Sequence, residues 1–265
     1  MMKKLLLMLL LTLSAFLGAQ AQGGGRPVLI RTVTEGARIF IDGKEVGMSP
    51  HRCILSIDSH WIYAIQGDMT SETFRIKVRR EKGALPDITL RFHNYVDLAL
   101  PSGTLWATSN VGADKPEDFG NYYAWSEPTP VTTTTTENYE YKSELRCEDD
   151  AASANWGSDW CMPTLEQLKE LTDKRFTIPT LSTREGINGL LITSRKNGNS
   201  LFLPAAGFSQ DGKVEDENTV GYYWSKTEGT TYLNAAYQLY FDGSDSFTNA
   251  CDRFYGRSIR PVRNK

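Results

Sequence analysis

Short runs of alternating apolar and polar residues, separated by turn-forming residues, make up the chain from Pro27 to about Phe92. In residues 73–79 the alternation is regular, which predicts a strand with one buried face and one basic, solvated face. Asp42-Gly43 favours a β-hairpin turn, because a type I′ turn needs a positive φ at both central residues. The pattern predicts a small β-sandwich-like module over residues 27–93. Its other predicted strands are residues 37–41, 44–47, 53–57, 61–66 and 87–92.

From residue 95 to residue 265 the pattern is again mainly that of strands, with one clear helix. Thr164 and Gln167 form a capping box, and leucines at helical spacing follow, which predicts an amphipathic helix over residues 165–173. The chain as a whole is therefore predicted to be mostly β, or α+β, in class. The other predicted elements are a short helix over 149–155, a hairpin of residues 189–194 and 200–203 about Asn197-Gly198, a turn at Asp242-Gly243 and a last strand over 255–262.

Two segments of this second domain echo each other, residues 120–126 (GNYYAWS) and 221–225 (GYYWS). A single echo at non-periodic spacing does not indicate a repeat architecture. Residues 132–136 are all threonine, and we expect them to form a surface loop.

The N-terminus carries the pattern of a secretory signal peptide over residues 1–21. Lys3 and Lys4 precede an uncharged apolar run over residues 5–17, and Ala19-Gln20-Ala21 has small residues at the positions that define a cleavage site. The run is too short to cross a bilayer, which takes about 20 apolar residues. We therefore expect an exported protein without a transmembrane segment, located in the periplasm, on the outer surface or outside the cell, whose mature chain starts near Gln22.

The charge balance argues against nucleic acid or anionic lipid as a ligand. The formal charge of the whole chain is −3, and removal of Lys3 and Lys4 leaves 27 basic against 32 acidic residues, a charge of −5. Because no block of Lys and Arg offsets this charge, the electrostatic attraction on which nucleic-acid binding depends is missing.

The first module carries one set of family-like motifs. In chain order these are Glu35-Gly36-Ala37, Ile39, Ile41-Asp42-Gly43, Val46-Gly47 and Ser49-Pro50. They resemble the PEGA domain, a small extracellular β module, although Thr34 stands where that family has its first proline. The resemblance implies a structural spacer without catalytic activity.

The second domain carries a longer series of motifs, spread over nearly all of residues 95–265. In chain order these are residues 97–107 (DLALPSGTLWA), 110–113 (NVGA), 150–152 (DAA), 154–157 (ANWG), Trp160, 162–164 (MPT), 203–207 (LPAAG), 221–225 (GYYWS) and 255–262 (YGRSIRPV). The series resembles the Fibrobacter major paralogous domain family, found on secreted proteins of gut bacteria. That family is similar in turn to C-type lectin-like folds, so the resemblance implies a C-type lectin-like α+β domain over residues 95–265.

Two of the four cysteines depart from the pattern of that family. Cys161 stands where the family usually has an arginine, and Cys251 where it usually has a polar residue. Because an exported protein can form disulfides, we predict a Cys161–Cys251 disulfide. The alternatives are two unrelated buried thiols, or Cys147 as the partner of one of them. Cys53, within an alternating apolar run, is predicted to be a buried strand residue.

The three histidines, His51, His60 and His93, all precede the predicted second domain. This placement would exclude from that domain a Ser-His-Asp or Cys-His nucleophile, a zinc site with a histidine ligand and a histidine base. Carboxylates remain as candidate catalysts for glycoside hydrolysis, in residues 144–150 and 211–217. Since solvated acidic loops are much commoner than catalytic pairs, we do not expect an enzyme.

The polar loop over residues 209–220 is the first part of the predicted ligand site. Asp211, Glu215, Asp216 and Asn218 offer oxygen atoms there to the hydroxyl groups of a ligand. Oxygen atoms are also the ligands of calcium, but the spacing is not that of an EF-hand. The Glu-Pro-Asn and Trp-Asn-Asp signatures of calcium-dependent lectins are missing as well, so we expect no cofactor.

Trp125 and Glu127 complete the predicted site. Trp125 stands at the end of a strand beside a polar segment, and an exposed indole there would stack on the C–H face of a sugar. The alternative is that Trp125 belongs to the core, which is the role expected of Trp106, Trp156, Trp160 and Trp224.

These observations favour a binding module of the cell envelope or the extracellular space. Its expected partner is a glycan, or a surface protein of the envelope or of a host. The alternatives are a purely structural envelope protein and a carboxylate-dependent glycoside hydrolase.

Overall fold

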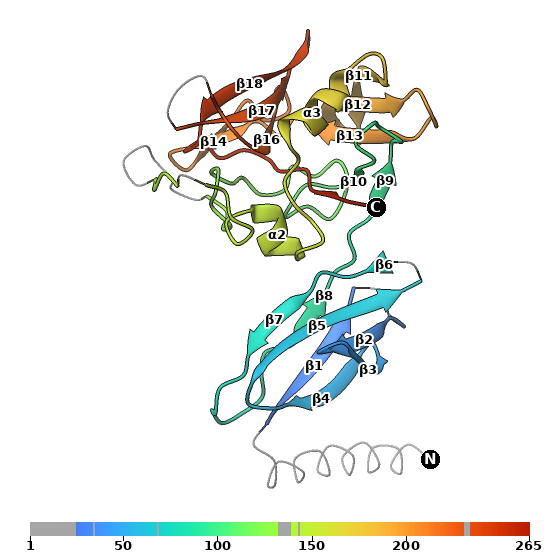
Figure 1. The fold of residues 1–265 in the computed structure, drawn as a ribbon, viewed down its shortest axis with the longest axis vertical. Helices are drawn as coiled ribbons and strands as arrows, with labels where there is room; N and C mark the ends of the chain where they lie inside the picture. Colours follow the sequence, from blue (N-terminus) through green and yellow to red (C-terminus); the bar gives the residue numbers. More distant parts are fainter. Residues whose placement is uncertain (1–24, 34, 68, 132–138, 143, 231–233) are drawn as a thin grey trace. The chain divides into compact units, whose positions relative to one another are not determined.

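The computed structural model describes residues 25–33, 35–67, 69–131, 139–142, 144–230 and 234–265. The chain divides into two compact units, Met1–Phe92 and His93–Lys265 (Figure 1). Both units are built mainly of strands, which confirms the predicted mostly β or α+β class. The predicted signal peptide and the threonine run lie outside the described residues. Within those residues, no helix combines the length and apolarity that crossing a membrane requires.

The described part of the first unit forms two β-sheets. One has the order β4-β1-β8, in which β1 (Arg26–Thr32) pairs antiparallel with β4 (His51–Leu55) and parallel with β8 (Ile88–Leu90). The other has the order β3-β2-β5-β6, and β7 also pairs with β5. Its strands are β2 (Arg38–Ile41), β3 (Lys44–Met48), β5 (Ser59–Gln66), β6 (Met69–Thr70) and β7 (Phe74–Lys77).

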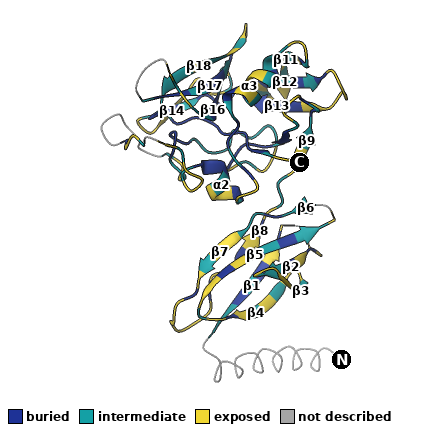
Figure 2. Cartoon of the chain, in the orientation of Figure 1, coloured by how far each residue is buried: buried dark blue, intermediate teal, exposed yellow. Residues whose placement is uncertain are grey.

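One hydrophobic core joins the two sheets of the first unit. Buried and exposed residues alternate along β5 (Figure 2), so that Ile62 faces the core while its neighbours face the other way. Ile62 packs with Ile39 of the same sheet and with Ile30 of the other sheet. The Asp42-Gly43 turn between β2 and β3 has φ angles of 52° and 80°, as the sequence predicted. The unit is therefore a small β-sandwich.

The described part of the second unit contains two antiparallel three-stranded sheets in which consecutive strands are neighbours. Their strands are β11 (Thr177–Arg184), β12 (Ile187–Ser194), β13 (Ser200–Pro204), β16 (Gly221–Glu228), β17 (Ala235–Phe241) and β18 (Ser246–Asp252). A third sheet, of order β19-β10-β9, joins the start and the end of the unit, and β14 pairs with β15 alone. Their strands are β9 (Tyr95–Asp97), β10 (Leu105–Ala107), β14 (Phe208–Gln210), β15 (Lys213–Glu215) and β19 (Val262–Arg263).

Both predicted helices are present, within a few residues of their predicted bounds. α3 (Leu165–Thr172) begins with the expected capping box, in which the Thr164 hydroxyl accepts from the Gln167 N–H at 3.1 Å and the Gln167 amide oxygen accepts from the Thr164 N–H at 2.8 Å. Asp150 is the N-cap of α2 (Ala151–Trp156), and its carboxylate accepts the N–H groups of Ala152 and Ser153 in the first turn. These caps satisfy donors that the helix itself leaves unpaired.

The sheet β16-β17-β18 has core on both of its faces. Tyr223 and Leu239 point to one side, where they pack with Leu168 of α3. Trp224 and Ala236 point to the other side, where they join a cluster rich in tryptophan. Because successive strand residues face opposite ways, the neighbours Tyr223 and Trp224 pack in different core clusters.

Two predictions about this unit are wrong. The last strand, expected over residues 255–262, is reduced to β19, since residues 256–262 are all buried and cross the core as irregular chain with isolated bridges to Tyr123 and Tyr223. His93 belongs to the second unit and stacks on Trp156, with ring centroids 3.5 Å apart. The second unit is therefore not free of histidine.

Candidate functional site

The acidic residues predicted to bind ligand lie on and beside the β14–β15 hairpin. Asp211 and Gly212 form its turn, with φ angles of 51° and 75°, and Asp211, Glu215 and Asp216 are exposed. Asn218 has a structural role, because its side-chain oxygen accepts the N–H of Asn188 at 2.7 Å. Three of the four predicted residues thus have carboxylates at the surface, and that of Asp216 accepts the Tyr222 hydroxyl.

The predicted exposure of Trp125 is wrong. Its side chain is 0% exposed and belongs to the tryptophan-rich core cluster. The indole N–H donates to the carbonyl of Ser225 at 2.9 Å, and the Arg253 guanidinium lies 4.1 Å from the ring centroid. The backbone N–H of Trp125 also donates to the Arg253 carbonyl at 2.8 Å. The polar segment that follows Trp125 suggested a surface position, but the chain from residue 253 onward covers the ring.

Glu127 is half-buried and pairs with a lysine. One of its carboxylate oxygens lies 3.8 Å from the ammonium of Lys142, which also donates to Asp149 at 2.7 Å. In the described part of the chain, no hydrogen bond or ion pair links Trp125 or Glu127 to the acidic hairpin. The structure therefore does not combine the two predicted halves into one site.

A row of aromatic side chains crosses the sheet beside the acidic hairpin. Tyr222, Tyr240 and Phe247 are register partners on adjacent strands, so they share one face of β16-β17-β18. Their ring centroids are 5.4 Å and 4.8 Å apart. Phe208 and Tyr255 extend the row beyond Tyr222, at centroid distances of 5.4 Å and 5.6 Å. We call these five residues the aromatic strip.

The strip is not among the sequence predictions, which centre on the acidic loop. Its strand residues alternate with the core residues Tyr223, Leu239 and Phe241. A period-2 analysis of residues 221–225 and 235–241 would have assigned Tyr222 and Tyr240 to the opposite face. Which part of that face stays uncovered depends on distant segments and is not visible in the local pattern.

One buried arginine supports the strip. The Arg257 guanidinium carbon lies 4.1 Å from the ring centroid of Tyr222, 4.7 Å from that of Phe208 and 4.9 Å from that of Tyr255. Its Nη2 donates to Sγ of Cys251 at 3.1 Å, while Nε and Nη1 have no hydrogen-bond partner among the described residues. Ring faces thus take the place of hydrogen-bond acceptors around this cation, and the cation in turn holds the rings in position.

Two carboxylates hold two of the three hydroxyl groups of the strip. Tyr222 donates to Asp216 at 2.9 Å, and Tyr240 donates to Asp242 at 2.7 Å. Hydrogen bonds from Ser244 and Tyr240 hold the pKa of Asp242 below its ordinary value. Burial, together with the Asp216 carboxylate, raises the pKa of Tyr222. At neutral pH the strip therefore presents the neutral phenol groups of Tyr222 and Tyr240 beside the ionised carboxylate of Asp242.

The predicted Cys161–Cys251 disulfide is not formed. All four cysteines are free thiols. Cys161 packs against the cluster that contains Leu168 and Tyr223, whereas Cys251 packs against the tryptophan-rich cluster and accepts from Arg257. Shared departure from a family pattern suggested that the two cysteines are neighbours, but they serve different cores.

Asp150 has the raised pKa of an acid catalyst, but it is not placed among the groups that such a catalyst needs. Burial raises the pKa of its carboxyl group, as the acid of a glycoside hydrolase requires. Its oxygens, however, accept the N–H groups of Ala152 at 2.9 Å, Ser153 at 3.1 Å and Met162 at 2.9 Å. These bonds cap α2 and anchor the chain before α3, so the role of Asp150 is structural.

No group of three or more His, Cys, Asp or Glu side chains in the described residues is arranged to hold a metal ion. The acidic hairpin is included in these residues. That ligand binding needs no calcium stays a prediction.

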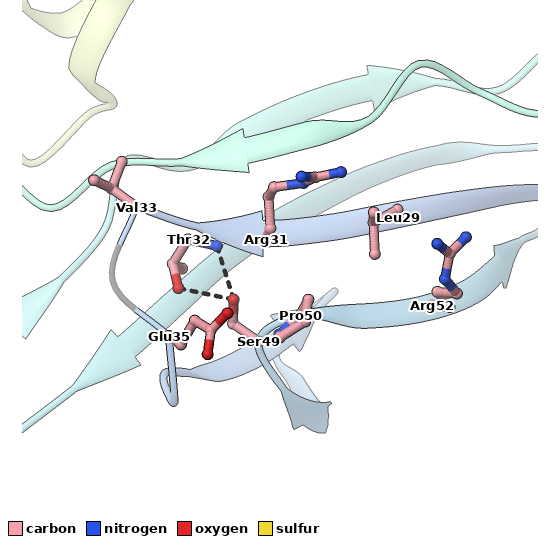
Figure 3. A pocket seen from close by; sticks show the side chains of 8 residues that line it. All are labelled: Leu29, Arg31, Thr32, Val33, Glu35, Ser49, Pro50 and Arg52. Carbon is pink, nitrogen blue, oxygen red and sulfur yellow. Dashed lines mark hydrogen bonds between the residues drawn. The ribbon is translucent and has the colours of Figure 1, made fainter. Parts of the chain in front are cut away.

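The first unit has an open pocket of about 640 Å³ on the outer side of the β4-β1-β8 sheet (Figure 3). Arg31 and Arg52 line it, and Arg31 forms an ion pair with Asp87. At one end, the N–H and the hydroxyl of Thr32 both donate to the Ser49 hydroxyl at 2.8 Å, as Figure 3 shows. These polar groups satisfy one another, and the pocket gathers no set of side chains that points to a particular ligand.

No protein-family model matches the chain, and comparisons with curated proteins and with solved structures also give no match. The resemblances to the PEGA domain and to the Fibrobacter major paralogous domain therefore stay predictions, and so does the C-type lectin-like fold of the second unit.

Proposed function

We propose that the second unit binds a glycan on the aromatic strip, within an exported protein of the cell envelope or the extracellular space. The observation that carries this proposal is the row of five rings, three of them placed side by side by strand register and two of them hydrogen-bonded to carboxylates. The C–H faces of a sugar are apolar and its hydroxyl groups are donors, so rings beside carboxylate acceptors match both parts of its surface.

The geometry of the strip favours a chain of sugars over a single small molecule. Neighbouring ring centroids are 4.8–5.6 Å apart, and three of the rings follow one another across β16, β17 and β18. Phe247 at one end is 44% exposed. A linear ligand can contact successive rings of such a row, whereas a compact ligand would use only one or two of them.

The rigidity of the strip supports a binding role. Arg257 lies against three of the rings, and two of the tyrosine hydroxyls are tied to Asp216 and Asp242. Side chains that are already ordered lose little conformational entropy when a ligand binds. Contact with solvent alone does not require side chains to be ordered in this way.

A glycan array probed with the mature chain, followed by calorimetry on the best ligand, tests the proposal. We expect Phe247→Ala to weaken binding about tenfold without changing the melting temperature, as the loss of a ring that contacts ligand does. Tyr95→Ala is the matched control, since Tyr95 is 40% exposed in the same unit but lies outside the strip. Binding that both Phe247→Ala and Tyr240→Ala leave unchanged contradicts the proposal. Shortening of the bound glycan during the experiment would support the hydrolase alternative instead.

A further inference from the structure

The first unit has a second aromatic surface, of opposite charge. It lies on the side of β2, β5 and β7 that faces away from the core formed by Ile39, Ile62 and Ile76. Register places Phe40 beside Tyr63 and Trp61 beside Arg75. We call the following residues the basic aromatic face: Arg38, Phe40, Trp61, Tyr63, Arg75 and Lys77.

Two of the rings of this face are stacked on each other, and the third is half exposed. Phe40 and Tyr63 are stacked, with centroids 5.0 Å apart and an interplanar angle of 5°. Trp61 precedes Tyr63 by two residues on β5, so both point to the same side, and Trp61 is 50% exposed. A tryptophan this exposed contributes little to the core, and its position beside two further rings indicates contact with a ligand.

Two of the three cations of this face lie against rings, and two of the three have no anionic partner among the described residues. The Arg75 guanidinium carbon lies 4.2 Å from the Trp61 ring centroid, and neither Arg75 nor Lys77 has an ion pair or a side-chain hydrogen bond in the described part of the chain. Arg38 lies 5.6 Å from the Phe40 centroid and 3.4 Å from a carboxylate oxygen of Glu45. Stacking on a ring leaves the N–H donors of a guanidinium available, and their planar arrangement fits a carboxylate.

We propose that the basic aromatic face binds an acidic polysaccharide, a chain whose sugar rings carry carboxylate groups. The rings would contact the C–H faces of the sugars, while Arg75 and Lys77 would bind the carboxylates. This inference does not rest on the function proposed for the second unit, which concerns different residues and a surface rimmed by acids.

Charge complementarity selects this ligand over the other polyanions. Residues 22–92 carry 11 Lys and Arg against 8 Asp and Glu, a formal charge of only +3, and Arg38 is paired with Glu45, so the face offers few cations to the uniformly high charge density of a nucleic acid. An acidic polysaccharide carries its charges at the spacing of sugar rings and offers apolar ring faces between them, and both features have counterparts on this face.

Binding to polygalacturonate, compared with fully methyl-esterified polygalacturonate, tests the proposal on the full mature chain. The ester keeps the same sugar backbone but carries no charge, so we expect at least tenfold weaker binding to it, and weaker binding to the acid at high salt. Arg75→Gln should weaken binding to the acid about tenfold, the size of a lost hydrogen bond to a charged group. Trp61→Ala should do the same, with an unchanged melting temperature because the ring is exposed.

Arg52→Gln is the matched control, since Arg52 lies on β4, in the opposite sheet of the same unit, and the same charge is removed. We expect this variant to bind like the wild type. Equal binding to acid and ester, absence of binding to the acid, loss of binding in Arg52→Gln, or tighter binding of a single-stranded oligonucleotide would each overturn the proposal. Phe247→Ala should leave this binding intact, which separates the result from the test of the aromatic strip.

Discussion

The indole N–H of Trp125 donates to the carbonyl of Ser225 at 2.9 Å, and the indole N–H of Trp224 donates to the carbonyl of Tyr123 at the same distance. The two tryptophans belong to the two segments whose sequences echo each other, and both are 0% exposed. Each segment therefore supplies the acceptor for the tryptophan of the other. The echo in the sequence corresponds to a reciprocal contact in the core.

Trp125→Ala is expected to destabilise the second unit by about 3–5 kcal/mol, because it removes a large side chain from a packed core. Trp125→Phe keeps most of the apolar surface but leaves the Ser225 carbonyl without its donor, so a loss of about 1–2 kcal/mol is expected. Urea unfolding measures both free energies. Trp61→Phe, at a ring that is 50% exposed in the first unit, should change the stability little. A Trp125→Ala protein as stable as the wild type would mean that the ring is not in the core.

Local patterns predicted those parts of the fold whose causes are local. The capping box of Thr164 and Gln167 and the positive-φ turn at Asp42-Gly43 depend on residues within a few positions of one another, and both are present as predicted. The segment over 255–262 resembles a strand, but strand formation needs a neighbour along its whole length. Its bridges to Tyr123 and Tyr223 both come from more than thirty residues earlier in the chain and leave most of it irregular.

The difference between local causes and distant contacts also explains which parts of the candidate site were predicted. The exposure of Asp211, Glu215 and Asp216 follows from local polarity and was predicted. The burial of Trp125 follows from Arg253, which lies far along the chain and covers its ring, so the neighbouring polar residues gave the wrong indication. The aromatic strip likewise exists only after three strands have paired in register.

Cys161 and Cys251 should both react with an alkylating reagent when the mature protein is unfolded without a reductant. The two thiols pack in different core clusters, and neither is bonded to another cysteine. Reduction should accordingly leave the melting temperature unchanged. Peptide mapping by mass spectrometry makes the comparison, and a cross-linked peptide containing Cys161 and Cys251 would contradict the structure.

Asp150→Asn should show a stability difference that depends on pH. Burial raises the pKa of Asp150 in the folded protein above its unfolded value, so folding favours the protonated form. Its contribution to stability is present at low pH and decreases as the pH rises through the folded-state pKa. The stability of the wild type minus that of Asp150→Asn should therefore fall as the pH rises from just below the ordinary carboxyl value to neutrality. Urea unfolding over this pH range measures the difference. The other carboxyl groups contribute equally to both proteins, so their contributions cancel. A difference that grows with pH would mean that the hydrogen bonds from Ala152, Ser153 and Met162 outweigh burial.

Arg260 is completely buried in the second unit. Its Nε donates to the Asn110 side-chain oxygen at 2.8 Å, and its Nη1 donates to the carbonyls of Thr108 at 2.8 Å and Ala107 at 3.2 Å. Asn110 in turn donates to the Tyr223 hydroxyl at 3.2 Å. Burial lowers the pKa of Arg260 to about 10, which leaves the guanidinium charged at neutral pH.

Arg260→Met should cost about 3–5 kcal/mol, because it leaves three buried acceptors without a donor. Arg260→Lys keeps the charge, but its compact ammonium cannot reach all three acceptors from one position, so it should recover only part of the loss. Urea unfolding measures both variants against Arg146→Met, in which an arginine side chain that is 69% exposed is removed and the change should stay within about 0.5 kcal/mol. If Arg260→Met were as stable as the wild type, apolar packing alone would suffice at this position. The network of Arg260, Asn110 and Tyr223 would then have no part in the stability of the unit.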